Sequence, residues 1–194
     1  MKRIIFILTL VLCFALPGGA YAQRCLPGMR GIQVTGGMVD GFYSSPTKSE
    51  TGYYFGAAMA TYVKSGNKWV FGGEYFERYY PYKDSRLPVA QFTAEGGYFL
   101  NVLSDPSKTF SLSLGGSAVA GYETVNWGDK LLFDGSTLET RDRFVYGGAI
   151  TLEMETYLTD CVVLLLTGRE RILSGSDVSK FHTQFGVGLK FIIN

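Results

Sequence analysis

The sequence has little of what enzymes and nucleic-acid-binding proteins commonly use. It contains one histidine and three cysteines among 194 residues, and these form no recognisable zinc-binding pattern. No glycine-rich phosphate loop follows a strand and opens a helix, so no nucleotide cofactor is expected. The net charge of +1 argues against a basic surface, and direct binding of nucleic acid is not expected either.

Long hydrophobic runs are also scarce, and the one at the N-terminus has the layout of a secretory signal peptide. Lys2 and Arg3 precede the apolar run 4–16, which is too short to cross a bilayer as a helix. Ala20 and Ala22 then provide a cleavage site of the small-x-small type. We therefore expect the signal peptide to be cleaved after Ala22 and the rest of the chain to be exported.

What the sequence does contain is alternation of apolar and polar or small residues, most clearly over residues 180–194. Phe185 and Val187 share one face of this stretch, and Gln184 and Gly186 share the other. A period of two predicts a strand, because successive side chains of an extended chain point to opposite sides. A strand of this length with two different faces is typical of a membrane-spanning wall.

Eight candidate strands follow from this pattern, and each is longer than the usual strand of a soluble sheet. They are 31–39, 52–64, 68–80, 89–100, 109–122, 143–157, 161–172 and 180–193. The links alternate between shorter and mostly longer ones, the shorter being 65–67, 101–108 and 158–160 and the longer 40–51, 81–88, 123–142 and 173–179. Short periplasmic turns and longer external loops are typical of outer-membrane barrels.

The two faces of the strands also favour a membrane barrel over a soluble β-sandwich. In the fifth strand Leu112 and Leu114 alternate with Ser111 and Ser113, which predicts an apolar outside and a polar inside. Aromatic residues gather near strand ends, where interfacial girdles lie: Tyr53, Tyr54, Trp69, Tyr79, Tyr80, Tyr82, Tyr98, Tyr122, Tyr146 and Tyr157. The predicted fold is all-β, an eight-stranded antiparallel up-and-down transmembrane β-barrel. The expected organisation is a signal peptide, a periplasmic N-terminal segment and an outer-membrane barrel, at 1–22, 23–30 and 31–194.

An eight-stranded barrel is narrow enough for side chains to fill it, so ionised residues on the inward register must be paired. We predict a salt-bridge network that seals the lumen, formed by Glu74, Arg78, Glu95, Glu153, Glu155, Arg169 and Arg171. His182, with nearby serines and glutamates, is the only candidate for nucleophilic catalysis. A lone histidine on an inward register is more commonly a polar wall residue, so we expect no enzyme activity.

Two cysteines, Cys25 and Cys161, remain after signal cleavage. An oxidising compartment permits a disulfide between them, and both are expected at the periplasmic mouth of the barrel. Two unrelated thiols explain the sequence equally well, so the disulfide is one of two alternatives.

Two resemblances to known proteins add to this reading. The ending resembles the C-terminal signal that the barrel-assembly machinery reads, through Gln184, Gly186, Leu189 and Phe191, although the chain continues to Asn194. The start Gln23-Arg24-Cys25-Leu26-Pro27, the segments at 36–41, 73–76 and 94–99 and the ending at 186–191 resemble the conjugal transfer protein TraO family of Bacteroidetes conjugative transposons.

The resemblance implies a component of a conjugative DNA transfer apparatus, a type IV secretion-like assembly, in the cell outer membrane. Its expected role is that of an anchor or scaffold and not of a wide pore. Its expected partners are outer-membrane lipid, the barrel-assembly machinery and other proteins of the conjugation apparatus. The alternative is a free-standing small barrel for adhesion or envelope integrity, because one fold hosts many functions.

Overall fold

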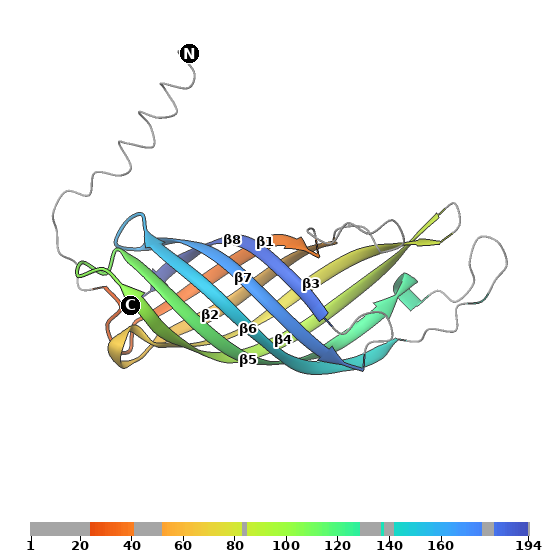
Figure 1. The fold of residues 1–194 in the computed structure, drawn as a ribbon, viewed down its shortest axis with the longest axis horizontal. Helices are drawn as coiled ribbons and strands as arrows, with labels where there is room; N and C mark the ends of the chain where they lie inside the picture. Colours follow the sequence, from red (N-terminus) through yellow and green to blue (C-terminus); the bar gives the residue numbers. More distant parts are fainter. Residues whose placement is uncertain are drawn as a thin grey trace, which may run out of the picture.

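The computed structural model describes residues 24–40, 52–82, 85–128, 137, 142–175 and 181–193. Eight antiparallel strands form one closed barrel in which each strand pairs with the next and β8 pairs with β1 (Figure 1). They are β1 (Arg30–Val39), β2 (Gly52–Tyr62), β3 (Lys68–Tyr82), β4 (Ser85–Ser104), β5 (Phe110–Val125), β6 (Arg143–Tyr157), β7 (Val162–Ser174) and β8 (Phe181–Ile193). The predicted fold class is confirmed.

The two ends of the barrel differ in their connections. One end, called the turn end here, carries the links 63–67, 105–109 and 158–161 together with the start of β1 and the end of β8. The other, the loop end, carries the links between β1 and β2, β3 and β4, β5 and β6, and β7 and β8. Most residues of the predicted long loops lie outside the described residues. No helix in the described ranges is long and apolar enough to cross a membrane.

The predicted loop 81–88 is wrong, because β3 and β4 continue through it as a paired ribbon that reaches Tyr82 and Ser85. The sequence predicts a loop there because proline has no backbone N–H to donate to a neighbouring strand. Pro88 is tolerated because β5 begins to pair with β4 only at Val89, so Pro88 lies on an open edge. β5 likewise runs three residues beyond its predicted end, and β4 passes a bulge at Asn101 and Leu103.

The outer wall of the barrel is apolar, whereas the lumen holds charged and polar side chains together with clusters of buried apolar ones. Large apolar side chains of every strand are exposed on the outer wall, among them Ile32, Phe55, Phe71, Phe92, Leu114, Ile150, Ile172 and Phe185. Polar and charged side chains are buried within, including Lys68, Glu74, Glu153, Arg171, Gln184 and Lys190. Such a surface is stable only in contact with lipid or detergent, because water would meet a continuous hydrophobic wall.

Exposed aromatic side chains flank the apolar wall. Exposed Trp69 lies near the turn end, with its ring centroid 4.8 Å from that of the half-buried Tyr98. Tyr53, Tyr122 and Tyr146 are exposed on strand segments nearer the loop end. Two members of the predicted girdles belong elsewhere: Tyr54 and Tyr157 are buried inside the barrel. Alternate residues of a strand face opposite sides of the wall, and both tyrosines stand at lumen-facing positions. Their nearness to a strand end does not change the side that they face.

Two adjacent glycines of β6 test how closely the strands approach. A Cβ at Gly147 would lie 1.9 Å from the backbone oxygen of Ile172 on β7, whereas one at Gly148 would meet its nearest atom, the Ser117 oxygen, at 3.4 Å. We expect Gly147→Ala to lower the free energy of unfolding by about 1–3 kcal/mol or more through overpacking. Gly148→Ala serves as the matched control and should change it little. Urea unfolding of the purified barrel in detergent measures both, and equal stability of the two variants would contradict the strand spacing.

Candidate functional site

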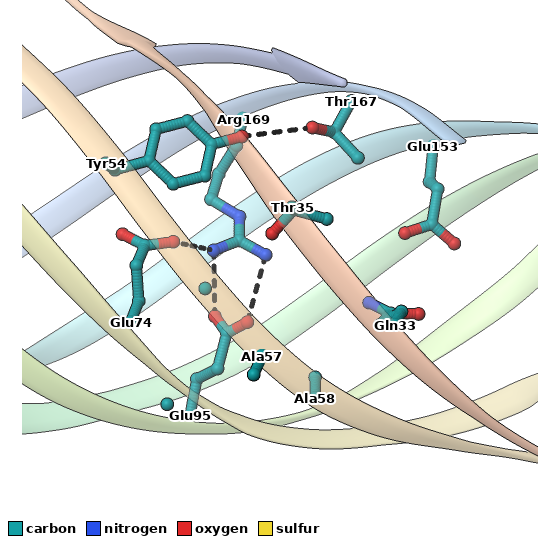
Figure 2. Close-up of a pocket in the computed structure, with 12 residues that line it drawn as sticks. Gln33, Thr35, Tyr54, Ala57, Ala58, Glu74, Glu95, Glu153, Thr167 and Arg169 are labelled. Carbon is teal, nitrogen blue, oxygen red and sulfur yellow. Dashed lines mark hydrogen bonds and ion pairs between the residues drawn. The ribbon is translucent and has the colours of Figure 1, made fainter. Parts of the chain in front are cut away.

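Two arginines of β7 hold two glutamates across the centre of the lumen. The Arg169 guanidinium contacts Glu95 on β4 at 2.9 and 3.1 Å and Glu74 on β3 at 3.1 Å (Figure 2). Arg171 also forms an ion pair with Glu74. Because residues 169 and 171 share a face of β7, both guanidinium groups point inward and bridge to the opposite wall.

Neutral groups add hydrogen bonds to this central cluster. Arg169 donates to the Thr151 hydroxyl at 3.0 Å, and Gln184 donates to Glu74 at 2.8 Å. The Tyr54 and Thr167 hydroxyls are 3.3 Å apart beside the cluster (Figure 2). Charges taken out of water are stable only when paired and hydrogen-bonded. The cluster meets most of this requirement, although Arg171 Nε and Gln184 Oε1 are buried without a hydrogen-bond partner among the described residues.

A second cluster fills the lumen at the turn end. The Lys68 ammonium lies 2.6 Å from Glu153 and 2.8 Å from Glu155, and Lys190 forms an ion pair with Glu155 and lies 3.7 Å from Glu153. All four side chains are at most 2% exposed. The Tyr62 hydroxyl donates to Glu155 at 3.0 Å. Two ammonium groups and two carboxylates balance one another in charge.

A third group lies at the loop end. The Asp40 carboxylate accepts hydrogen bonds from Arg78 at 2.5 Å and from the Thr183 backbone N–H at 2.9 Å, and His182 Nδ1 lies 3.2 Å from it. Burial alone would raise the pKa of Asp40, but the hydrogen bonds from His182 and Thr183 and the charge of Arg78 bring its pKa below the usual value. His182 therefore lies in an ion group on the lumen wall, with its ring also 5.3 Å from that of Phe76.

The seven residues of the predicted network all point inward, but they divide among these three groups instead of forming one network. The sequence reasoning missed Lys68, Lys190 and Asp40, which supply essential partners. The two lysines stand at strand ends on the inward register, so the period of two could have found them. Asp40 lies just after β1, where the strand period no longer indicates direction.

A small cavity lies in the lumen beside the central cluster. The cavity beside Arg169 has a volume of about 10 Å³, which is room for at most about one water molecule. It is lined by side chains from six strands, among them Gln33, Thr35, Tyr54, Glu74, Glu95, Glu153 and Thr167 (Figure 2). Side chains therefore fill the lumen around Arg169.

The N-terminal segment covers the turn-end mouth. Arg24 donates to the Thr109 hydroxyl at 2.6 Å, and its guanidinium lies 5.1 Å from the centre of the Tyr157 ring. The backbone pairs with the end of β2, because Gly28 N–H donates to the Tyr62 oxygen and Tyr62 N–H donates to the Met29 oxygen. Residues 26–28 at the tip of this segment remain exposed.

The structure has Cys25 and Cys161 as free thiols, which is one of the two alternatives that the sequence left open. The physical reason is that Cys25 turns into the mouth, where it is 3% exposed, with its sulfur 3.6 Å from the Tyr157 hydroxyl. Burial raises the pKa of the Cys25 thiol above its usual value. Cys161 lies in the exposed turn before β7.

The residues of the predicted assembly signal occupy both faces of β8. Gln184 is buried and donates to Glu74, and a Cβ on Gly186 would clash with the Tyr54 hydroxyl. Leu189 and Phe191 are exposed on the outer wall. Each of these residue types thus has a role in the folded wall, and the signal stays a prediction. Among the described residues no group of three potential metal ligands comes together.

Comparison with known proteins places this geometry in a family. The model of the family described as conjugative transposon protein TraO matches residues 26–193, and the chain therefore belongs to this family. Comparison with curated protein sequences gives no significant match.

Two solved structures show that the fold is of the outer-membrane barrel type. Neisserial surface protein A is similar with a TM-score of 0.53 and 12% identity, over 86% of this chain and 97% of its own. The attachment invasion locus protein Ail of Yersinia pestis has a TM-score of 0.50 and 11% identity, over 87% of this chain and 100% of its own. At these identities the likeness concerns the fold alone.

Removing one lysine of the turn-end cluster should leave a buried carboxylate without its partner. We expect Lys68→Met to lower the free energy of unfolding by about 3–5 kcal/mol, because an unpaired buried charge is costly. Adding Glu153→Gln restores the charge balance and should recover a substantial part of this loss. Urea unfolding in detergent at neutral pH measures both. A double variant no more stable than Lys68→Met would contradict the charge pairing.

The two thiols should differ sharply in reactivity. In the folded barrel Cys161 is exposed and should react with a maleimide reagent within minutes, while Cys25 should stay protected because it is buried. After denaturation both should be labelled, as mass spectrometry of the intact protein will show. A species that carries no label until a reductant is added, and runs differently on non-reducing gels, would show instead that the disulfide forms.

Proposed function

We propose that this TraO-family barrel is an anchor or scaffold of a conjugation apparatus in the outer membrane, holding other transfer proteins at its periplasmic mouth. The proposal depends on two features observed together: a lumen filled by side chains around Arg169, and an N-terminal segment fixed across one mouth of the barrel. The packed interior leaves no route for DNA or protein, so the barrel must act through its surfaces.

The orientation follows from the connections. Outer-membrane barrels keep short turns in the periplasm and longer loops outside, which assigns the turn end to the periplasm. Export would follow from cleavage of the signal peptide after Ala22, and insertion from recognition of the β8 ending by the barrel-assembly machinery. Outer-membrane lipid would then cover the apolar wall. The exposed tip at Leu26 would face the space in which a transfer channel spans the envelope.

Within this proposal the barrel is neither a catalyst nor a conductor. His182 is engaged with Asp40, and the polar groups of the lumen are held in ion pairs beyond the reach of a substrate. Within the proposal the charges stabilise the wall and close it. Purified protein in a planar bilayer should therefore show no discrete conductance steps, and steps of a defined size would refute the sealed lumen.

A tip variant tests the anchoring role. In donor cells that carry the whole transfer system, gentle detergent extraction after crosslinking should recover other transfer proteins with the tagged barrel. Leu26→Asp should lower this recovery, and the frequency of DNA transfer, by roughly tenfold or more, because a charge at an apolar contact removes its central anchor. Leu26 is 41% exposed, so the barrel itself should fold.

Trp127→Ser is the matched control, since this exposed apolar residue lies at the loop end. It should leave co-purification unchanged. Recovery of no transfer protein by the unmodified barrel would refute the anchoring role and favour a free-standing barrel for adhesion or envelope integrity.

A further inference from the structure

The outer wall has a groove that is separate from the periplasmic mouth, where the proposed anchoring contact lies. It lies over β5, β6 and β7, which form neighbouring diagonals of the barrel wall in Figure 1, and its volume is about 610 Å³. The side chains around it are small or apolar with one exception, a carboxylate. The outward-facing lining residues are Gly116, Gly148, Ile150, Glu170, Ile172 and Ser174.

The groove exists because two outward-facing positions are glycines. The packing of the strands does not require glycine at either position. A Cβ at Gly116 would meet no atom within 4 Å, and one at Gly148 would meet its nearest atom at 3.4 Å. On the inward side, by contrast, a Cβ at Gly147 would overlap the backbone of β7. Larger residues would fit at both outward positions, so the hollow is a property of the outer surface itself.

Glu170 places a carboxylate on the lipid-facing side of the wall. Its chain neighbours Arg169 and Arg171 point into the lumen, so Glu170 points outward. Its neighbours on the outer face, Ile150 and Ile172, are 63% and 50% exposed. The carboxylate thus lies within the apolar belt, where ionisable residues are costly and mark functional contacts.

The barrel itself supplies this carboxylate with one hydrogen bond, from the Thr183 hydroxyl at 2.6 Å. Glu77, the other outward-facing glutamate of the described strands, is treated differently. It is 6% exposed and accepts hydrogen bonds from Tyr53, Tyr75 and Tyr79. The Glu77 carboxylate is thus enclosed by hydroxyl groups, whereas Glu170 lines the groove and accepts a hydrogen bond at one oxygen.

We infer that the groove is a docking site for a membrane-embedded segment of a second protein, which presents a lysine or arginine to Glu170. Small residues allow close approach of a partner backbone in a membrane, and a buried cation satisfies the free carboxylate oxygen. A lipid acyl chain would fill the hollow but brings no hydrogen-bond donor.

A second copy of the chain fits less well than a different protein. A two-fold contact through the groove would bring Glu170 against Glu170, and like charges repel. Among the described strand residues, the outward basic residue Arg30 lies at the first position of β1, at the turn end and far from the depth of Glu170. The inference rests on the proposed function only in expecting the partner among the transfer proteins.

Photo-crosslinking in living cells tests the site. A photoreactive residue at position 150, in the groove, should give an adduct with another protein in cells that carry the whole transfer system. The same residue at position 55, an exposed position on β2, should give none. Mass spectrometry of the crosslinked peptide should place it in a membrane-embedded segment that contains a lysine or arginine.

Two variants then test recognition, with heat-dependent gel mobility as the check that the barrel has folded. Glu170→Gln and Gly116→Leu should each lower the adduct yield by at least about tenfold, because one removes the charge and the other fills the hollow. Gly73→Leu is the matched control: Gly73 is an exposed glycine of β3 with its nearest atom at 3.5 Å. It should leave the yield unchanged. If Gly116→Leu does not fold, Glu170→Gln decides alone.

Several outcomes would overturn the inference: an adduct of twice the chain's own mass, adducts with lipid only, no adduct at position 150, or an unchanged yield in folded Glu170→Gln. The proposed function fails separately. A partner at position 150 that is no transfer protein, together with the absence of transfer proteins at the periplasmic mouth, would refute the anchoring role and leave the groove as a docking site. If transfer proteins are still recovered at the periplasmic mouth but position 150 gives no adduct, the groove is not a docking site and the anchoring role stands.

Discussion

The whole structure depends on the pairing of charges inside a barrel too narrow to hydrate them. Ionised groups removed from water are destabilising unless each finds a counter-charge, and here they do so by crossing the lumen. Arg169 reaches Glu95 on β4, and Lys68 on β3 reaches Glu153 on β6. Because these contacts join strands that are not neighbours in the sheet, they brace the wall from within. The same contacts fill the space through which anything could pass.

Much of this architecture could be predicted from the period of two in the sequence. Alternation identifies the strands and assigns most side chains to lipid or lumen, since a lipid-facing wall permits few exceptions. It fails where the period stops. Beyond Glu77 the ladder between β3 and β4 continues through Pro81 and Pro88, so the prolines interrupt the pattern without ending the strands. Asp40 follows the last residue of β1 and belongs to no strand. The division of the lumen charges into separate groups depends on which strands face each other across the barrel, and no local pattern contains that information.

Because ion pairs cross the lumen, the functional interest moves to the surfaces of the barrel. The turn-end mouth presents a fixed tip at Leu26, and the wall over β5 to β7 presents a hollow with a carboxylate at its edge. These surfaces lie in different surroundings, one in water and one in lipid. A rigid barrel that offers both could hold a soluble and a membrane-embedded component at a constant distance from each other.

The packing of Cys25 has a consequence for the order of assembly. Its side chain lies in a cluster with Tyr62 from β2, Tyr157 from β6, and Val163 and Leu165 from β7, so strands from across the barrel build its site. That site does not exist until the strands have met around the mouth. Residues 24–29 consequently reach their final place after the strands, although they precede every strand in the sequence. A protein that binds the exposed tip would thereby recognise finished barrels and pass over those still being inserted.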